Sequence, residues 1–125
     1  MEIFRFEEFA GTENPDPGTR YRQDILTDEQ KAKNLGGIFG LLPPDGKVSY
    51  HFHNKRESII IALSGEAAEI VEGKEIPIKA NDVLYIPAGE KHMMVNNTGN
   101  DFRYLEFFTY PPVMSDRIEV ECRTK

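Results

Sequence analysis

Three histidines are the residues of this sequence best suited to do chemistry: His51, His53 and His92. His51 and His53 stand two residues apart in a run where apolar and polar side chains alternate, which predicts a β-strand. Side chains two residues apart on a strand leave on the same face, roughly 6.5 to 7 Å apart along the backbone. Both imidazoles can therefore face one metal ion. The single cysteine, Cys122, excludes a cysteine-rich site, so the ligands must be nitrogen and oxygen atoms.

The remaining ligands of such a site are expected on the neighbouring strands. Glu57 begins the next strand-like run after three polar residues, so a short hairpin can turn its carboxylate towards the ion held by the first two imidazoles. His92 follows Pro87-Ala88-Gly89, a turn sequence that directs the next strand. The sequence thus predicts four metal ligands: His51, His53, Glu57 and His92.

Two segments around these residues resemble the two motifs of the cupin superfamily, in particular its small single-domain members. Gly46, the run His51-Phe52-His53-Asn54-Lys55-Arg56-Glu57 and Gly65 resemble the first motif, which contains His-x-His, three or four residues and Glu. Residues 81–96 resemble the second motif, Pro-x-Gly, two residues, His, three residues and Asn. The resemblance is strong over residues 46–96. It implies an all-β, single-domain double-stranded β-helix, the cupin or jelly-roll barrel, with a divalent metal held by the four residues named above.

The sequence departs from the cupin pattern in two places that bear on the site. Asn81 replaces the opening glycine of the second motif, and asparagine is a residue that tolerates a positive φ. Seven residues rather than six separate Glu57 from Gly65, which leaves Ser58 at the ligand position counted back from that glycine. If Glu57 faces inward, the large side chains of Ile59, Ile61 and Leu63 face inward with it. If Ser58 faces inward instead, the site gains only a hydroxyl group, which is a weak metal ligand. We therefore predict Glu57 as the ligand.

Three imidazoles and one carboxylate suit Fe, Mn, Ni, Zn or Cu, and suit Ca or Mg poorly. An octahedral ion with four protein ligands keeps two positions for water, substrate or dioxygen. Each imidazole must be neutral to bind, so metal occupancy is expected to fall below about pH 6.5. The metal would act as a Lewis acid or a dioxygen site on a small organic acid or sugar-derived substrate.

Three hypotheses for function remain open at this point. The first is an enzyme, in which Tyr104, Glu106 or Arg103 enters the cavity according to the phase of its strand. The second is a non-catalytic cupin that binds or senses a small ligand through the metal. The third is a structural barrel with no required metal.

Three polar residues near the motifs are predicted to have structural roles. Lys55 and Arg56 are predicted to form a solvated hairpin tip, and Asn96 is predicted to form hydrogen bonds with the backbone of a turn.

Short strands are predicted almost throughout the chain, separated by turn sequences such as Pro43-Pro44-Asp45-Gly46 and Asn96-Asn97-Thr98-Gly99. Many short strands at even spacing favour a sandwich or a closed barrel. One helix of about two turns is predicted over 27–33, with Thr27 as N-cap and Gln30 as its capping-box partner. Residues 1–20 are predicted to form an N-terminal strand followed by a loop arm.

Length and charge limit the class of protein and its partners. A chain of 125 residues favours one domain, and its longest apolar run, Ile59 to Leu63, is far too short to cross a bilayer. The net charge is −6 without a Lys/Arg stripe, so nucleic acid is not an expected partner. The start of the chain lacks the pattern of a secretory signal, which predicts a cytoplasmic protein. The expected partners are a small-molecule ligand and, as the cupin resemblance implies, a second copy in a homodimer, with Phe4, Phe6 and Phe9 covering the partner's sheet.

Overall fold

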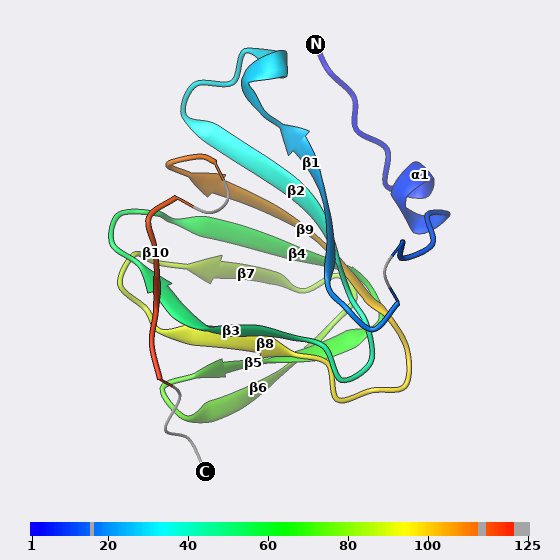
Figure 1. Cartoon of the computed structure of the whole chain (residues 1–125), viewed down its shortest axis with the longest axis vertical. Coiled ribbons are helices and arrows are strands. Elements are labelled where there is room, and N and C mark those ends of the chain that lie inside the picture. The colour runs from blue at the N-terminus through cyan, green and yellow to red at the C-terminus, as the bar shows by residue number, and fades with distance from the viewer. Residues whose placement is uncertain (16, 113–114, 122–125) are drawn as a thin grey trace.

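The computed structural model describes residues 1–15, 17–112 and 115–121, and these fold into two five-stranded antiparallel sheets (Figure 1). The strand order is β1-β2-β9-β4-β7 in the first sheet, called sheet A, and β10-β3-β8-β5-β6 in the second, called sheet B. The elements are α1 (Phe6–Ala10), β1 (Tyr21–Leu26), the 3₁₀ turn η1 (Asp28–Gln30), β2 (Leu35–Leu42), β3 (Lys47–His53), β4 (Ser58–Ser64), β5 (Glu66–Val71), β6 (Lys74–Lys79), β7 (Val83–Ile86), β8 (His92–Val95), β9 (Phe102–Thr109) and β10 (Arg117–Glu119). This is the all-β, double-stranded β-helix that the sequence predicts.

The main core lies between the two sheets. Apolar side chains from both sheets meet there and are almost fully buried; they are Ile38, Leu42, Ile60, Ala62, Ala67, Ile78, Ile86, Met94, Phe102, Tyr104 and Phe108. The turns between strands fall where the sequence predicts them. Asn81 has a φ of 79°, so the residue that replaces the motif glycine does adopt the left-handed conformation. Asn96 is buried and donates from its amide to the carbonyls of Leu42 and Asn100, which confirms its structural role.

Glycines on β2 make room for aromatic rings on β9. Gly36 pairs with Phe108 and Gly40 with Tyr104 across the antiparallel ladder. A Cβ atom added at Gly40 would lie 2.2 Å from Cζ of Tyr104, and one added at Gly36 would lie 2.3 Å from the Phe108 ring. Both rings therefore lie directly over the β2 backbone, and the Tyr104 ring reaches into the space between the sheets.

The pleat of β4 has the opposite phase to the one expected from the sequence. Ser58, Ile60 and Ala62 face the interior, whereas Ile59 faces outward and is 45% exposed. The expectation that Glu57 and the odd-numbered residues of β4 face inward is wrong. The reason is that the outer face of sheet A is also apolar, so apolar content does not distinguish the two faces of this strand.

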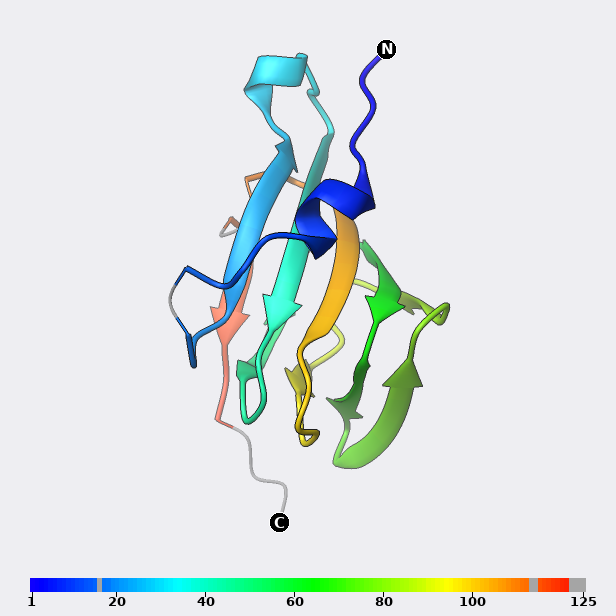
Figure 2. The ribbon, with the colours of Figure 1, turned by 90° about the vertical axis from the view of Figure 1, so that its right-hand side faces the viewer.

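A second apolar cluster covers the outer face of sheet A and explains that apolar face. α1 lies across the sheet, and Figure 2 shows the helix in front of β2 and β9. Phe9 is 1% exposed and stacks on Phe39 with ring centroids 5.1 Å apart. The predicted N-terminal strand is therefore wrong: residues 6–10 are helical because the phenylalanines at 6 and 9 then meet the chain's own sheet.

The predicted helix over 27–33 is a single 3₁₀ turn, η1. Its capping box is confirmed, because the backbone N–H of Thr27 donates to Oε1 of Gln30 over 2.9 Å and the backbone N–H of Glu29 donates to Oγ1 of Thr27. Lys31 adopts a positive φ of 61°, which ends the turn before a second one can form. Throughout the described ranges, neither helix has the length and apolar character needed to cross a membrane.

Candidate metal centre

Two neighbouring strands of sheet B bring the three histidines together. His51 and His53 lie on β3, and His92 on β8 pairs directly with His51 across the ladder. The ring centroid of His51 lies 4.4 Å from that of His92 and 5.0 Å from that of His53. One nitrogen of each ring can be chosen so that all three lie within 4.8 Å of one another, and all three residues are buried. The expected convergence of these side chains is confirmed.

The Nδ1 atom of each imidazole is held by an oxygen acceptor. His51 Nδ1 bonds the carbonyl of Ser49 over 2.6 Å, and His53 Nδ1 bonds the carbonyl of Asp116 over 2.9 Å. Because a carbonyl can only accept, these two rings carry their proton on Nδ1 and leave an unprotonated Nε2. His92 Nδ1 bonds Glu69 over 2.6 Å, and its Nε2 is buried with no hydrogen-bond partner among the described residues. The donor set thus fits a metal ion.

Burial keeps two of the imidazoles neutral. It lowers the pKa of His51 to about 3 and that of His53 to about 4, both well below the ordinary value of 6.5. The hydrogen bonds to Ser49 and Asp116 oppose this shift only in part. Neutral imidazole is the form that binds a metal, so at these two residues protons begin to compete at a lower pH than the 6.5 expected from the sequence.

Glu69 on β5 orients His92 and was not identified from the sequence. Its side chain is 3% exposed, and its Oε2 has no partner within the described part of the chain. Burial raises the pKa of its carboxyl group, although the hydrogen bond to His92 opposes that rise. The signal in the sequence is a charged residue between Ala68 and Ile70, inside the otherwise apolar run 67–71, which predicts a buried carboxylate only if the strand phase is known.

The structure does not bring Glu57 to the three imidazoles. Its carboxylate is exposed and accepts a hydrogen bond from the hydroxyl of Tyr85 over 2.5 Å. Ser58 takes the inward position instead and donates to the carboxylate of Glu106 on β9. Ser58, and not Glu57, therefore holds the inward position six residues before Gly65, and the carboxylates that line the cavity in the described part of the chain are Glu69 and Glu106.

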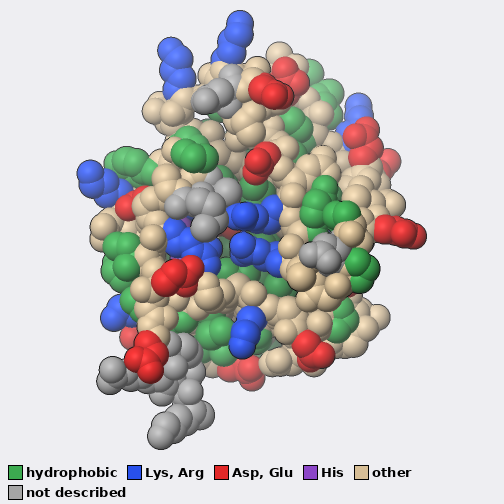
Figure 3. All heavy atoms as spheres, viewed as in Figure 1, with side chains coloured by type: hydrophobic (Ala, Val, Ile, Leu, Met, Phe, Trp, Pro, Cys, Tyr) green, Lys and Arg blue, Asp and Glu red, His purple; other side chains and the backbone are tan. Residues whose placement is uncertain are grey.

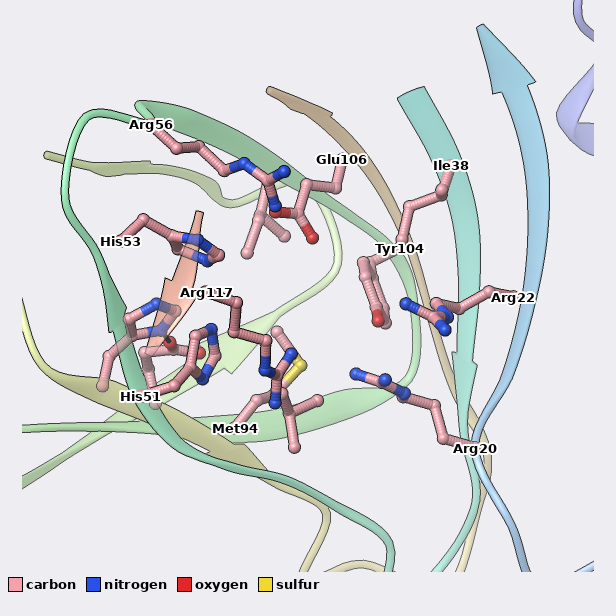
Figure 4. A pocket seen from close by; sticks show the side chains of 14 residues that line it. Arg20, Arg22, Ile38, His51, His53, Arg56, Met94, Tyr104, Glu106 and Arg117 are labelled. Atoms are coloured by element: carbon pink, nitrogen blue, oxygen red, sulfur yellow. Dashed lines mark hydrogen bonds and ion pairs between the residues drawn. The ribbon is translucent and has the colours of Figure 1, made fainter. Parts of the chain in front are cut away.

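A cavity of about 40 Å³ opens beside the three histidines. Lys and Arg side chains surround a hollow in the middle of the face shown in Figure 3, and Figure 4 shows guanidinium groups entering it from opposite sides. Tyr104 and Glu106 line the cavity, as one phase of β9 allowed, whereas Arg103 points away and donates to the carbonyls of Phe9 and Thr12. The lining residues include Arg20, Arg22, Arg56 and Arg117.

Arg56 is not part of a solvated hairpin tip. Its side chain is 2% exposed and donates to the carbonyls of Thr109, Tyr110 and Pro112. Its guanidinium also lies 4.4 Å above the ring centroid of Phe108. Arg56 therefore ties the segment after β9 to the β3–β4 turn, and its charge faces Glu106 in the cavity. Lys55 is exposed, as expected.

The family model described as "Cupin domain" matches residues 39–108, which hold all three histidines. The chain belongs to the cupin family. A relative, the oxalate-binding protein of Thermotoga maritima, is 38% identical over 82 residues, which are 64% of this chain and 68% of the relative.

Solved cupin-like structures agree with this assignment. A conserved protein with a double-stranded beta-helix domain from Klebsiella pneumoniae superposes with a TM-score of 0.78 over 98% of this chain and 99% of its own, at 20% identity. A predicted oxalate decarboxylase from Thermotoga maritima superposes with a TM-score of 0.67 at 29% identity, over 74% of this chain and 81% of its own. The first likeness shows the fold alone, so the chemistry of this cupin must be argued from its own cavity.

Proposed function

We propose that this cupin binds a divalent transition metal through Nε2 of His51, His53 and His92 and uses it to hold a small organic acid. The observation that carries the proposal is the buried Nε2 of His92, which has no hydrogen-bond partner in the described part of the chain and lies beside two imidazoles whose Nδ1 atoms are already engaged. A buried polar atom without a partner is costly, and a metal ion would satisfy this one. The oxalate-binding relative supports the choice of an organic acid as ligand.

The residues of the chain orient the imidazole rings and limit the size of the ligand at this site. The backbone carbonyls and Glu69 engage Nδ1 of the three rings and leave Nε2 available to a metal ion. When bound, the metal would supply a Lewis acid for an oxygen atom of the ligand. The cavity next to the rings has room for only a few water-sized groups, since one water needs about 10–15 Å³. The ligand is therefore a small molecule of a few carbon atoms.

Metal analysis of protein purified without a histidine tag tests this proposal. Wild-type protein is expected to retain close to one divalent ion per chain, and the substitutions His51→Ala and His92→Ala are each expected to abolish retention with little loss of fold. Far-UV circular dichroism and thermal unfolding check the fold. An exposed-site control, Glu57→Gln, should retain the metal. Full retention in the histidine variants would contradict the proposed ligand set.

Catalysis is the second candidate function, and the position of Glu106 favours it. Its carboxylate lies in the cavity, bonded by Ser58 and facing Arg56, and burial raises the pKa of the carboxyl group. A carboxyl group in that environment can hold or release a proton beside the ligand. Turnover of uronates, keto acids and small dicarboxylates should be measured with Fe, Mn, Ni and Zn supplied separately. Loss of turnover in Glu106→Gln with metal retained supports catalysis, whereas a ligand that is bound and never consumed supports a binding protein.

A further inference from the structure

Three arginines from opposite ends of the chain converge in the cavity beside the histidines. Arg20 directly precedes β1 of sheet A, Arg22 lies in β1, and Arg117 lies at the start of β10 in sheet B. Figure 4 shows the guanidinium groups of Arg20 and Arg22 directed towards Tyr104 and Arg117, with His51 and His53 on the other side of Arg117. All six residues line the same cavity as His92.

Carboxylates match this concentration of positive charge only in part. The chain has a net charge of −6, yet the described residues that line its cavity include four arginines and two carboxylates, Glu69 and Glu106; a third carboxylate, Glu119, pairs with Arg117. Glu106 faces Arg56, and Glu69 is engaged with His92. No salt bridge joins Arg20 to a carboxylate within the described ranges, although burial and the nearby arginines both lower its pKa. Like charges held close together in a partly buried site favour an anionic ligand.

The position of Arg117 is fixed by two hydrogen bonds from its guanidinium group. Its Nε donates to Glu119 over 2.8 Å, and its Nη2 donates to Oγ of Ser49 over 2.8 Å. Arg117 also pairs with His53 across the β10–β3 ladder, and the preceding residue supplies the carbonyl that holds His53. The same short strand therefore orients one candidate metal ligand and places one guanidinium, which sets the distance between the two groups.

We propose that Arg20, Arg22 and Arg117 form an anion-binding subsite opposite the three histidines, and that the ligand of this cupin is a small dicarboxylate whose two carboxylates face the metal and the arginines. A planar guanidinium matches a carboxylate with two parallel hydrogen bonds. The cavity of about 40 Å³ favours a dicarboxylate with two to four carbon atoms over a sugar acid. This inference rests on the proposed function, because it places one carboxylate at the metal.

Binding measurements on Ni²⁺-loaded protein test the subsite. Titration calorimetry with oxalate, malonate and succinate, and with formate, acetate and inorganic phosphate, gives the preference for dicarboxylates. Arg20→Gln and Arg22→Gln are each expected to weaken oxalate or malonate binding about 10- to 100-fold, and to weaken formate binding much less. The double variant should lose most of the preference. Arg5→Gln, at an exposed arginine remote from the cavity, is the matched control.

Metal content measured on every variant separates the two proposals. Wild-type protein that retains no metal contradicts the proposed function. In that case the same titrations are carried out on metal-free wild type and arginine variants, and a preference for dicarboxylates that the variants lose still supports the subsite. Equal preference in wild type and the double variant, with metal retained in both, overturns the subsite. Phosphate binding as tight as oxalate binding also overturns it, since a compact single anion would then suffice. Thermal unfolding verifies that each variant is folded.

Discussion

The candidate metal site depends on oxygen atoms that form hydrogen bonds with Nδ1 of each imidazole ring. Each Nδ1 has one oxygen acceptor, and two of the three acceptors are backbone carbonyls that no side-chain substitution removes. Glu69 is the exception, because it holds His92 through a carboxylate. A carboxylate behind a ligating imidazole raises the basicity of the ring and fixes its tautomer. The charge of Glu69 is therefore the feature of this site most open to experiment.

Glu69→Gln is expected to weaken metal binding about 10- to 100-fold while leaving the fold intact, because the amide oxygen can still accept from Nδ1 but carries no charge. Competition with a chelator measures the affinity. Glu66→Gln, at an exposed carboxylate on the same strand, is the matched control. Equal metal affinities in the two variants would show that the charge of Glu69 does not act on the metal.

At the residue scale, the sequence predicted the three histidines and named Tyr104 and Glu106 as residues that one strand phase brings into the cavity, but it missed four other charged groups. His51, His53 and His92 are recognisable because their spacing on strands is local information. Glu69, Arg20, Arg22 and Arg117 reach the cavity through pairings between distant strands, and such pairings leave no local pattern. Glu57 shows the opposite failure, since its type suited a ligand but its position on the pleat directs it to solvent.

The close contact between strands β2 and β9 holds the ring of Tyr104, which lines the cavity. Gly40→Ala would place a methyl group 2.2 Å from Cζ of Tyr104, so the ring must move or the strands must separate. The expected cost is about 1–3 kcal/mol of the free energy of unfolding, measured by denaturant titration. Gly99→Ala is the control, because a Cβ there meets nothing within 4 Å. Similar stabilities of the two variants would contradict the tight contact between Gly40 and Tyr104.

Strand existence was predictable at the element scale, and strand phase was not. The alternation of apolar and polar residues around His51 and His53 corresponds to β3, and the turn sequences lie between the observed strands. The phase of β4 could not be predicted, because Ile59 and Ile60 face opposite sides of a sheet that is apolar on both. The N-terminal helix was missed because the spacing of Phe4 and Phe6 fits a strand, whereas the spacing of Phe6 and Phe9 fits one face of a helix, and the second spacing is the one that the structure uses.

The whole molecule is expected to lose stability in acid when it is free of metal. The folded-state pKa values of His51 and His53 lie below 6.5, so the unfolded chain binds protons more readily. The stabilisation that comes from keeping these two imidazoles neutral is complete above pH 6.5. It is lost as the pH falls from 6.5 through the folded-state pKa values, about 4 for His53 and about 3 for His51. Glu69 and Glu106 act in the opposite sense, because burial raises their pKa values.

Denaturant midpoints at pH 7, 5 and 4 measure this effect in metal-free protein. Wild type should lose more stability over that range than the double variant His51→Gln/His53→Gln, in which the carboxylates are unchanged. The difference between the two slopes isolates the imidazoles. Parallel slopes would show that burial does not depress the pKa values of these two residues.

A homodimer remains the prediction for the assembled molecule. β4 and β7 present an apolar surface on the outer face of sheet A, where Ile59 pairs with Tyr85 and Ile61 pairs with Val83. Val83 is 66% exposed and Tyr85 is 59% exposed in the single chain. The phenylalanines expected to cover a partner instead pack on the chain's own sheet, so this β4–β7 surface is the part left for a second copy.

Light scattering should give a mass of about 29 kDa, twice the 14.3 kDa of one chain. Val83→Lys is expected to shift the mass towards that of one chain, because a charge would be buried at the contact. Ile76→Lys on the edge strand β6 of sheet B should leave the mass unchanged. A wild-type mass near 14.3 kDa would contradict the dimer.

The position of β10 has a consequence for how the site is made during synthesis. The carbonyl that orients His53 belongs to Asp116, and one of the cavity guanidiniums belongs to the next residue. A nascent chain that has emerged only as far as β9 already carries all three histidines, but one ring lacks its acceptor. The site should therefore be complete only once residues 116 and 117 have joined the rest of the fold, and a fragment ending before residue 115 should bind metal more weakly than a chain that contains them.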